Sequence, residues 1–192
     1  SAIGVQLEQA DLWAKFKAHG TEMIVTKVGR LLFPKLAIRV SGLDPNALYG
    51  MHLKLERADQ LKYRYSTGCW SSSPADCDDG LPKPHEVEPN EGFIQHGHAF
   101  MAKPIEFSNF KVTNNCEENS RSVLLLQTLH KYVPVIYIFR AEPSSMGHNT
   151  ITLIHVERLH LAEFITVTAY QSEAIKELKK LHNPFAKGER SS

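Results

Sequence analysis

The chain has 192 residues, of which 42% are hydrophobic and 22% charged, and its net charge is +1. That length fits a single domain with a substantial core, and the composition argues against wholesale disorder. No apolar run approaches the roughly 18–20 residues that a membrane span needs, so we expect no membrane partner. Three scattered cysteines, Cys69, Cys77 and Cys116, do not make a disulfide framework and favour a reducing compartment.

The small net charge conceals two regions of opposite sign. Residues 76–91 carry six acids against Lys83 alone, a local charge of −5, whereas residues 12–40 carry a local +5. A basic face therefore survives outside the acidic segment, and local charge decides contact with phosphates more than the total does. We expect the acidic segment to lie on the face opposite to Arg30 and Lys111.

Along the chain, the first expected element is a short helix that Asp11 caps and that ends near Gly20. Alternating apolar and polar residues then predict half-buried strands around residues 51–55 and 62–65. Stretches rich in Ile, Val, Thr and aromatic residues predict further strands at 22–27, 36–40, 122–127, 135–140, 150–156 and 163–168. Residues 71–99, with four prolines and many acids, are expected to form a long irregular insertion. About nine short strands without alternating helices predict an all-β sandwich or barrel.

A second helix is predicted near the C-terminal end. Ser172 can cap it, and Asn183-Pro184 ends it, because proline disfavours helical geometry in the residue before it. Its apolar face is expected to contain Ala174, Ile175, Leu178 and Leu181. Three lysines, Lys176, Lys179 and Lys180, are expected largely off that face.

Signatures of catalysis are absent from the sequence. It holds no Gly-x-Ser-x-Gly elbow, no phosphate-binding loop ending in Gly-Lys-Ser/Thr and no Gly-x-Gly-x-x-Gly turn, so we expect neither enzyme activity nor a cofactor nor a small-molecule substrate. His96 and His98 could present two imidazoles on one side of a strand. A zinc site needs further ligands at suitable spacing, and scattered surface histidines are the competing interpretation.

Three segments carry residue types that suit nucleic-acid contact. Basic residues recur from Lys27 to Arg39, as in a DNA-contacting loop or a solvated hairpin rim. Residues 111–115 combine a cation, a hydroxyl and amides at a strand end, which can bind phosphate or simply form a turn. Phe185 follows the broken helix between lysines, as a minor-groove wedge would, or as a segment packed on the core would.

Taken together, these segments resemble the T-box family of transcription factors, the group that includes Brachyury. The matching stretches run in order over almost the whole chain: Leu12-Trp13 and Phe16, residues 20–27, Gly29-Arg30, Phe33-Pro34, residues 42–45, Tyr63, Tyr65 and Trp70, residues 113–115, 130–132 with Pro134, 167–171 and 183–188.

The resemblance implies one T-box domain over residues 1–192. Its fold would be all-β, an immunoglobulin-like β-sandwich with a short N-terminal helix and C-terminal helices that contact DNA. Its function would be sequence-specific binding of double-stranded DNA, through the major and minor grooves, at an element related to TCACACCT. The protein would be a nuclear, developmental transcription regulator of RNA polymerase II genes, and the family pattern allows a homodimer on palindromic sites.

The resemblance also assigns roles to individual residues. Arg30 would contact a guanine edge, where a guanidinium bonds O6 and N7 together, and Lys111 and Thr113 would hold backbone phosphates. Thr168 and Tyr170 would position the last helix. Residues 171–190 would form that helix and the minor-groove segment, in which Asn183, Pro184 and Phe185 enter the groove and Lys187 binds phosphate.

Several positions depart from the family pattern. Leu31 stands where a second arginine is usual, and Glu189 stands where a second groove phenylalanine is usual. Such losses of cationic and apolar contacts predict a divergent member with altered affinity or sequence preference. The alternative is a protein-interaction β-sandwich that keeps the fold and has weakened DNA binding.

Overall fold

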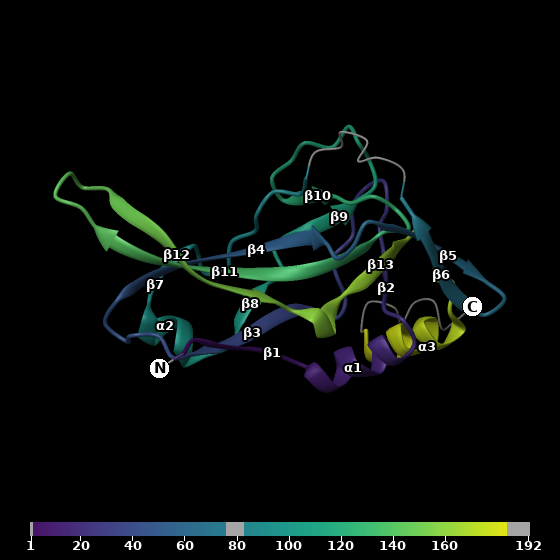
Figure 1. The fold of residues 1–192 in the computed structure, drawn as a ribbon, viewed down its shortest axis with the longest axis horizontal. Coiled ribbons are helices and arrows are strands. Elements are labelled where there is room, and N and C mark those ends of the chain that lie inside the picture. The colour runs from purple at the N-terminus through teal and green to yellow at the C-terminus, as the bar shows by residue number, and fades with distance from the viewer. Residues whose placement is uncertain (1, 76–82, 184–192) are drawn as a thin grey trace.

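The computed structural model describes residues 2–75 and 83–183 and shows an all-β, immunoglobulin-like sandwich (Figure 1). Its strands are β1 (Gly4–Leu7), β2 (Glu22–Ile24), β3 (Leu36–Ser41), β4 (Leu48–Arg57), β5 (Leu61–Ser66), β6 (Cys69–Pro74), β7 (Ile94–His96), β8 (Ile105–Phe107), β9 (Lys111–Thr113), β10 (Val123–Leu125), β11 (Lys131–Pro143), β12 (Asn149–Arg158) and β13 (Phe164–Val167). The helices are α1 (Ala10–Ala18), α2 (Gly97–Ala102), the 3₁₀ turn η1 (His160–Ala162) and α3 (Glu173–His182).

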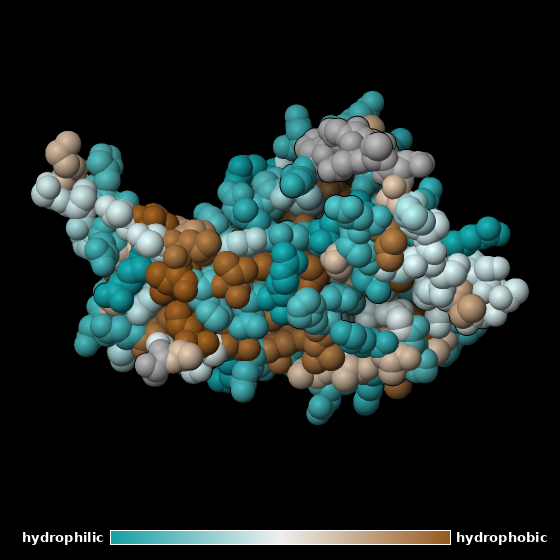
Figure 2. Space-filling view, in the orientation of Figure 1, coloured by the Kyte–Doolittle hydropathy of each residue, from teal (hydrophilic) through white to brown (hydrophobic). Residues whose placement is uncertain are grey.

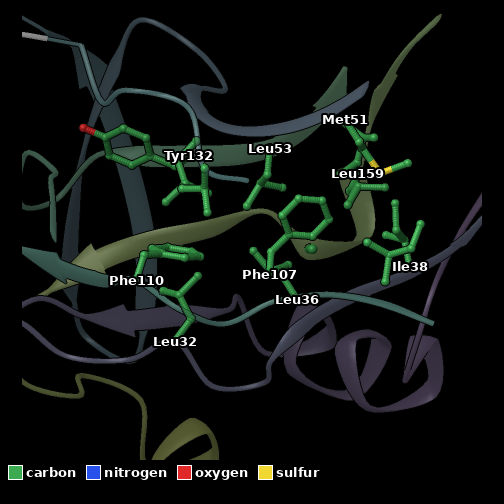
Figure 3. Packing of buried hydrophobic residues seen from close by; sticks show 14 of the residues in the cluster. Leu32, Leu36, Ile38, Met51, Leu53, Phe107, Phe110, Tyr132 and Leu159 are labelled. Atoms are coloured by element: carbon green, nitrogen blue, oxygen red, sulfur yellow. The ribbon is translucent and has the colours of Figure 1, made fainter. Parts of the chain in front are cut away.

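Two sheets enclose the core. The larger has the strand order β2–β13–β11–β4–β7, with β12 also paired to β11, and the smaller has the order β1–β3–β8. Met51 and Leu53 on β4 face Leu36 and Ile38 on β3 across the interior, and Phe107 of β8 packs between them (Figure 3). The predicted alternation in β4 is confirmed, because the apolar positions are fully buried while His52 and Lys54 are half-exposed.

The predicted irregular segment 71–99 is confirmed over residues 83–93, where Val87 makes one isolated bridge, and is wrong at both ends, which form regular elements. Residues 69–74 form β6, which pairs with β5 through a two-residue turn at Thr67 and Gly68. Both turn residues have positive φ, 51° and 81°, as the right-handed twist of a tight hairpin requires. Later in the segment Val87 bridges to Leu53, and β7 and the start of α2 follow.

The start of α1 also differs from expectation. The helix begins at Ala10, after Gln9 in a left-handed conformation, and no side chain caps it. Asp11 lies inside the first turn instead, where a carboxylate complements the partial positive charge of the helix N-terminus. Trp13 and Phe16 bury the inner face of this helix.

The β11–β12 hairpin extends from the end of the sandwich that lies opposite α3 (Figure 1). Within the described residues β12 pairs only with β11, so its other edge is open. Four apolar side chains of this strand are more than 40% exposed, namely Ile151, Leu153, Ile154 and Val156. Figure 2 shows apolar residues gathered on this part of the surface. No helix in the described ranges is long and apolar enough to span a bilayer.

We expect Leu53→Ala to lower the free energy of unfolding by about 2–5 kcal/mol, because it opens a cavity between the two sheets. Leu153→Ala is the matched control, since the same truncation at an exposed β12 position should change stability by no more than about 0.5 kcal/mol. Urea unfolding followed by circular dichroism measures both. Equal losses would contradict the assignment of Leu53 to the core and Leu153 to the surface.

Candidate nucleic-acid interface

The loop that carries Arg30 is fixed to β9 by its main chain. The Arg30 N–H donates to the Val112 carbonyl at 3.0 Å, and the Val112 N–H donates back to the Arg30 carbonyl at 2.8 Å. This antiparallel bridge pairs Arg30 with Val112, the residue that follows Lys111 on β9, and the side chains of Arg30 and Lys111 are both exposed. Backbone hydrogen bonds thus bring two residues that are 81 positions apart in the sequence onto adjacent segments.

Gly29 lets the loop lie directly on Lys111. Its φ of +92° is in the region that favours glycine, and a β-carbon there would sit 3.3 Å from Cβ of Lys111. The turn leaves two apolar side chains at the surface, Val28 at 85% exposed and Leu31 at 51%. Arg30 is therefore flanked by exposed apolar groups.

Thr113 does not hold a phosphate, and that expectation is corrected. The residue is fully buried, and its hydroxyl donates toward the Thr26 carbonyl at 2.7 Å, with the Lys27 carbonyl at 3.1 Å. The same oxygen accepts the Asn115 N–H at 3.0 Å. The hydroxyl's one donor hydrogen is used internally and the side chain is buried, so Thr113 orients the base of the Arg30 loop.

Helix α3 is held at its N-terminus by a buried carboxylate. Glu22 of β2 is 0% exposed and accepts the N–H groups of Gln171 and Ser172 at 2.7 and 3.0 Å. Burial raises the pKa of Glu22, while these two N–H groups and the charge of Lys179 oppose the rise. Ser172 then caps the helix by accepting the Ile175 N–H at 3.4 Å, as predicted.

Lys179 was expected off the buried face, and the structure buries it. Lys179 is four positions after Ile175, so both lie on the inner face of α3. Leu181, which was predicted on the apolar face, is 67% exposed. The ammonium donates to the Phe33 carbonyl and lies 3.6 Å from Sδ of Met23.

Three aromatic rings surround the Lys179 ammonium. The ring centroids of Phe16, Phe33 and Tyr170 lie 5.5, 6.0 and 5.6 Å from Nζ, which is cation–π distance. Desolvation and, to a smaller extent, repulsion by the nearby Arg30 lower the pKa of Lys179 to about 7, while the charge of Glu22 opposes this shift. The helix therefore rests against α1 and the Arg30 loop through a buried cation (Figure 1).

The remaining residues with predicted roles fall into two groups. Thr168 is exposed just after β13, Tyr170 is half-buried with its ring toward Lys179, and Asn183 ends α3 by donating its N–H to the Lys179 carbonyl at 2.8 Å. Three residues predicted at the minor groove, Pro184, Phe185 and Lys187, lie outside the described residues, as does Glu189.

Part of the acidic segment lies beside β9 and β10, against expectation. Glu86 is 3.5 Å from the guanidinium of Arg121, and the next residue, Ser122, accepts the Lys111 N–H at 2.8 Å. Glu86 therefore lies near the segment that pairs with Lys111, and the next residue, Val87, is held to Leu53 by two main-chain hydrogen bonds. Residues 76–82 lie outside the described ranges.

The two histidines that were considered as a metal-binding pair, His96 and His98, stack on each other. The rings of His96 and His98 lie 5.3 Å apart and nearly parallel. Within residues 2–75 and 83–183 no three His, Cys, Asp or Glu side chains gather in a way that could hold a metal ion.

Sequence reasoning missed the two residues that hold α3 in place. Glu22 had a usable signal, because a single acid begins the apolar run Met23-Ile24-Val25 and a buried acid needs donors. Lys179 had none, since helical periodicity treats lysine as a surface residue.

A family model described as T-box matches residues 5–191. The chain belongs to the T-box family. T-box protein 37 of Caenorhabditis elegans is 40% identical over 194 residues, covering 100% of this chain and 60% of that protein. T-box transcription factor tbx-8 of the same species is 40% identical over 193 residues, covering 97% of the chain and 59% of that protein. T-box transcription factor T of Xenopus laevis is 40% identical over 193 residues, covering 96% of the chain and 40% of that protein. The chain therefore spans about 40–60% of the length of these relatives.

Because Lys179 is buried among three aromatic rings, we expect the stability of this T-box domain to depend on pH. The unfolded chain keeps Lys179 near the ordinary lysine pKa of roughly 10.4, and the folded chain holds it at about 7. Between these values the unfolded chain binds more protons, so the free energy of unfolding rises with pH by at most about 1.4 kcal/mol per unit. Glu22, with its raised pKa, contributes with the opposite sign.

We expect urea unfolding to give a larger free energy at pH 9 than at pH 7 in the parent. Lys179→Met should remove most of that difference, because it removes the titrating group while keeping an apolar stem. Lys176→Met, on the same helix, should retain it. If Lys179→Met keeps the parental pH dependence, the lysine is not desolvated as described.

Proposed function

We propose that this T-box domain binds double-stranded DNA sequence-specifically, as the DNA-binding part of a nuclear transcription factor that regulates RNA polymerase II genes. The observation that carries the proposal is the main-chain bridge that fixes the loop of the exposed Arg30 against β9, the strand that also carries the exposed Lys111. A guanidinium on a fixed loop can bond a guanine edge with two parallel hydrogen bonds, while a neighbouring ammonium neutralises a phosphate. The proposed role needs no catalytic group and no cofactor.

Each described residue has a distinct part in the proposed complex. Arg30 reads guanine within an element related to TCACACCT, and Lys111 holds a phosphate. Thr168, exposed at the entry to α3, offers its hydroxyl to the backbone, and Tyr170 positions the helix through the Lys179 cage. Asn183 leads into residues 184–187, which we propose enter the minor groove.

Leu31 explains why recognition should differ from the usual family pattern. The side chain is half-exposed beside Arg30, where a second arginine would add a phosphate or base contact. Without that cation the complex releases fewer counterions, so its affinity depends less on salt. Base contacts then contribute a larger share of the total binding free energy.

Arg30→Ala should flatten base preference at one position, because one bidentate guanine contact contributes about 1–3 kcal/mol of discrimination. Random-oligonucleotide selection with the purified chain, before and after the change, measures this preference. Lys35→Ala is the matched control, since it removes an exposed cation from the same segment and should leave the selected sequence unchanged. Equal losses on selected and scrambled duplexes would reduce Arg30 to a phosphate contact. A parent that selects no sequence would overturn the proposed function.

A second candidate function is protein interaction, and the open β12 edge favours it. Its exposed apolar residues lie at the end of the molecule opposite α3 (Figure 1), so this surface would stay accessible while DNA is bound. Unpaired strand edges with apolar side chains are sites of strand addition by other chains. A homodimer on palindromic DNA is a separate proposal, tested by the mass of the complex on a palindromic duplex.

We expect Leu153→Lys to abolish any protein contact at β12 while leaving affinity for a single DNA site unchanged. Sedimentation of the chain alone, over a range of concentrations, detects self-association through this edge. Thr152→Lys is the control, because it places the same charge at the adjacent position, which points to the opposite face of the strand. A loss of DNA affinity in Leu153→Lys alone would place DNA, rather than a protein, against this hairpin.

A further inference from the structure

Helix α3 is fastened to the rest of the fold at two points. Glu22 holds the N–H groups that precede the helix, and Lys179 reaches from its second half to the Phe33 carbonyl. Phe33 lies three residues after Arg30 on the same loop. The Lys179 contact therefore joins the two elements that the proposed function assigns to DNA, across 146 positions of sequence.

Packing alone does not require a cation at this position. A methionine would fill the space between Phe16, Phe33 and Tyr170 without the cost of desolvating an ammonium, and replacing a buried ion by an apolar group is often neutral or stabilising. What methionine cannot do is donate a hydrogen bond to the Phe33 carbonyl. The amino group, protonated or neutral, therefore contributes something other than bulk, which is a directional hydrogen bond between the helix and the loop.

We propose that Lys179 is a positioning residue for DNA recognition, which locks α3 to the Arg30 loop so that the two contact elements keep one fixed separation. The proposal rests on the proposed function. Unlike the proposed function, it assigns a role to a residue that does not touch DNA, because the Lys179 side chain is only 3% exposed. Two contact elements held at one spacing favour the one duplex geometry that fits both, which raises discrimination rather than general affinity.

The charges around Lys179 add a property that a purely structural lysine would lack. The groups that face it are Glu22 on β2, Arg30 on the loop and the phenol of Tyr170, while Phe16, Phe33 and Met23 are uncharged. Arg30 lowers the pKa of Lys179 by repulsion. A DNA phosphate or base edge at Arg30 offsets that repulsion, so the bound state holds the Lys179 proton more tightly. Binding then takes up protons near neutral pH, and affinity falls as pH rises.

The test uses a duplex containing TCACACCT and a scrambled duplex, each titrated with the chain at pH 6.5 and pH 8.5. For the parent we expect tighter binding to the TCACACCT duplex than to the scrambled one. Its affinity for the TCACACCT duplex should fall roughly tenfold from pH 6.5 to pH 8.5, which is less than the uptake of one full proton per complex would give. Lys179→Met should lose roughly tenfold on the TCACACCT duplex at pH 6.5, little on the scrambled one, and should show a flat pH profile. Lys176→Met is the control: any loss of affinity should be equal on the two duplexes, and the parental pH profile should be kept.

A second measurement needs no variant. Calorimetric titration of the parent at pH 7.5, in two buffers of different ionisation enthalpy, should show net proton uptake on binding the TCACACCT duplex. Zero uptake, or a Lys179→Met chain that keeps both the parental preference and the parental pH profile, overturns the proposal. If the parent prefers neither duplex, both the proposed function and this inference are overturned. If the parent prefers the TCACACCT duplex and Lys179→Met shows the same preference and pH profile, only the inference is overturned.

Discussion

The carboxylate of Glu22 is the constraint on which the arrangement of the C-terminal helix depends. It is buried at the start of β2, the strand that pairs in parallel with β13, and the chain leaving β13 must turn within a few residues to begin α3. The N–H groups of Gln171 and Ser172 lie in that turn and find their acceptor in Glu22. Without it these two main-chain donors would lose a charged acceptor, and hydrogen bonds to charged groups contribute about 1.5–3 kcal/mol each. The direction in which α3 leaves the sandwich is thereby tied to the largest sheet.

The interface is assembled from backbone hydrogen bonds more than from side-chain contacts. Arg30 is placed by its exchange with Val112, and the base of its loop is held by the hydroxyl of Thr113. Main-chain bonds of this kind do not titrate, and they leave the side chains of Arg30 and Lys111 exposed to solvent. Such an arrangement suits a surface whose side chains must find their partners on another molecule.

The sequence predicted the regular parts of the fold well and the buried polar groups poorly. Alternation in β4 and the Ser172 cap follow local rules, and both are confirmed. Three-residue strands such as β7 and β8 are too short for a periodic signal, so their positions depend on tertiary pairing. Thr113 and Lys179 were misplaced for a common reason: each polar group is satisfied by a carbonyl distant in sequence, which no local pattern reveals. The acidic segment was misplaced because two main-chain hydrogen bonds between Val87 and Leu53 hold its described part against β4, and a charge pattern does not reveal such bonds.

In the proposed complex, Leu31 and Val28 would alter the base contacts that the Arg30 loop can make. Both side chains are exposed on either side of a guanidinium, and an apolar group in the major groove has one favourable base contact, the methyl group of thymine. A cation at position 31 would gain affinity on any sequence through phosphate, whereas leucine gains only where a thymine methyl is present. With leucine at position 31, attraction to phosphates of any sequence is weaker, and the affinity depends more on which base lies beside the loop. In the proposed complex, weaker general attraction at this loop leaves discrimination to base contacts of this kind and to the spacing of the elements that make them.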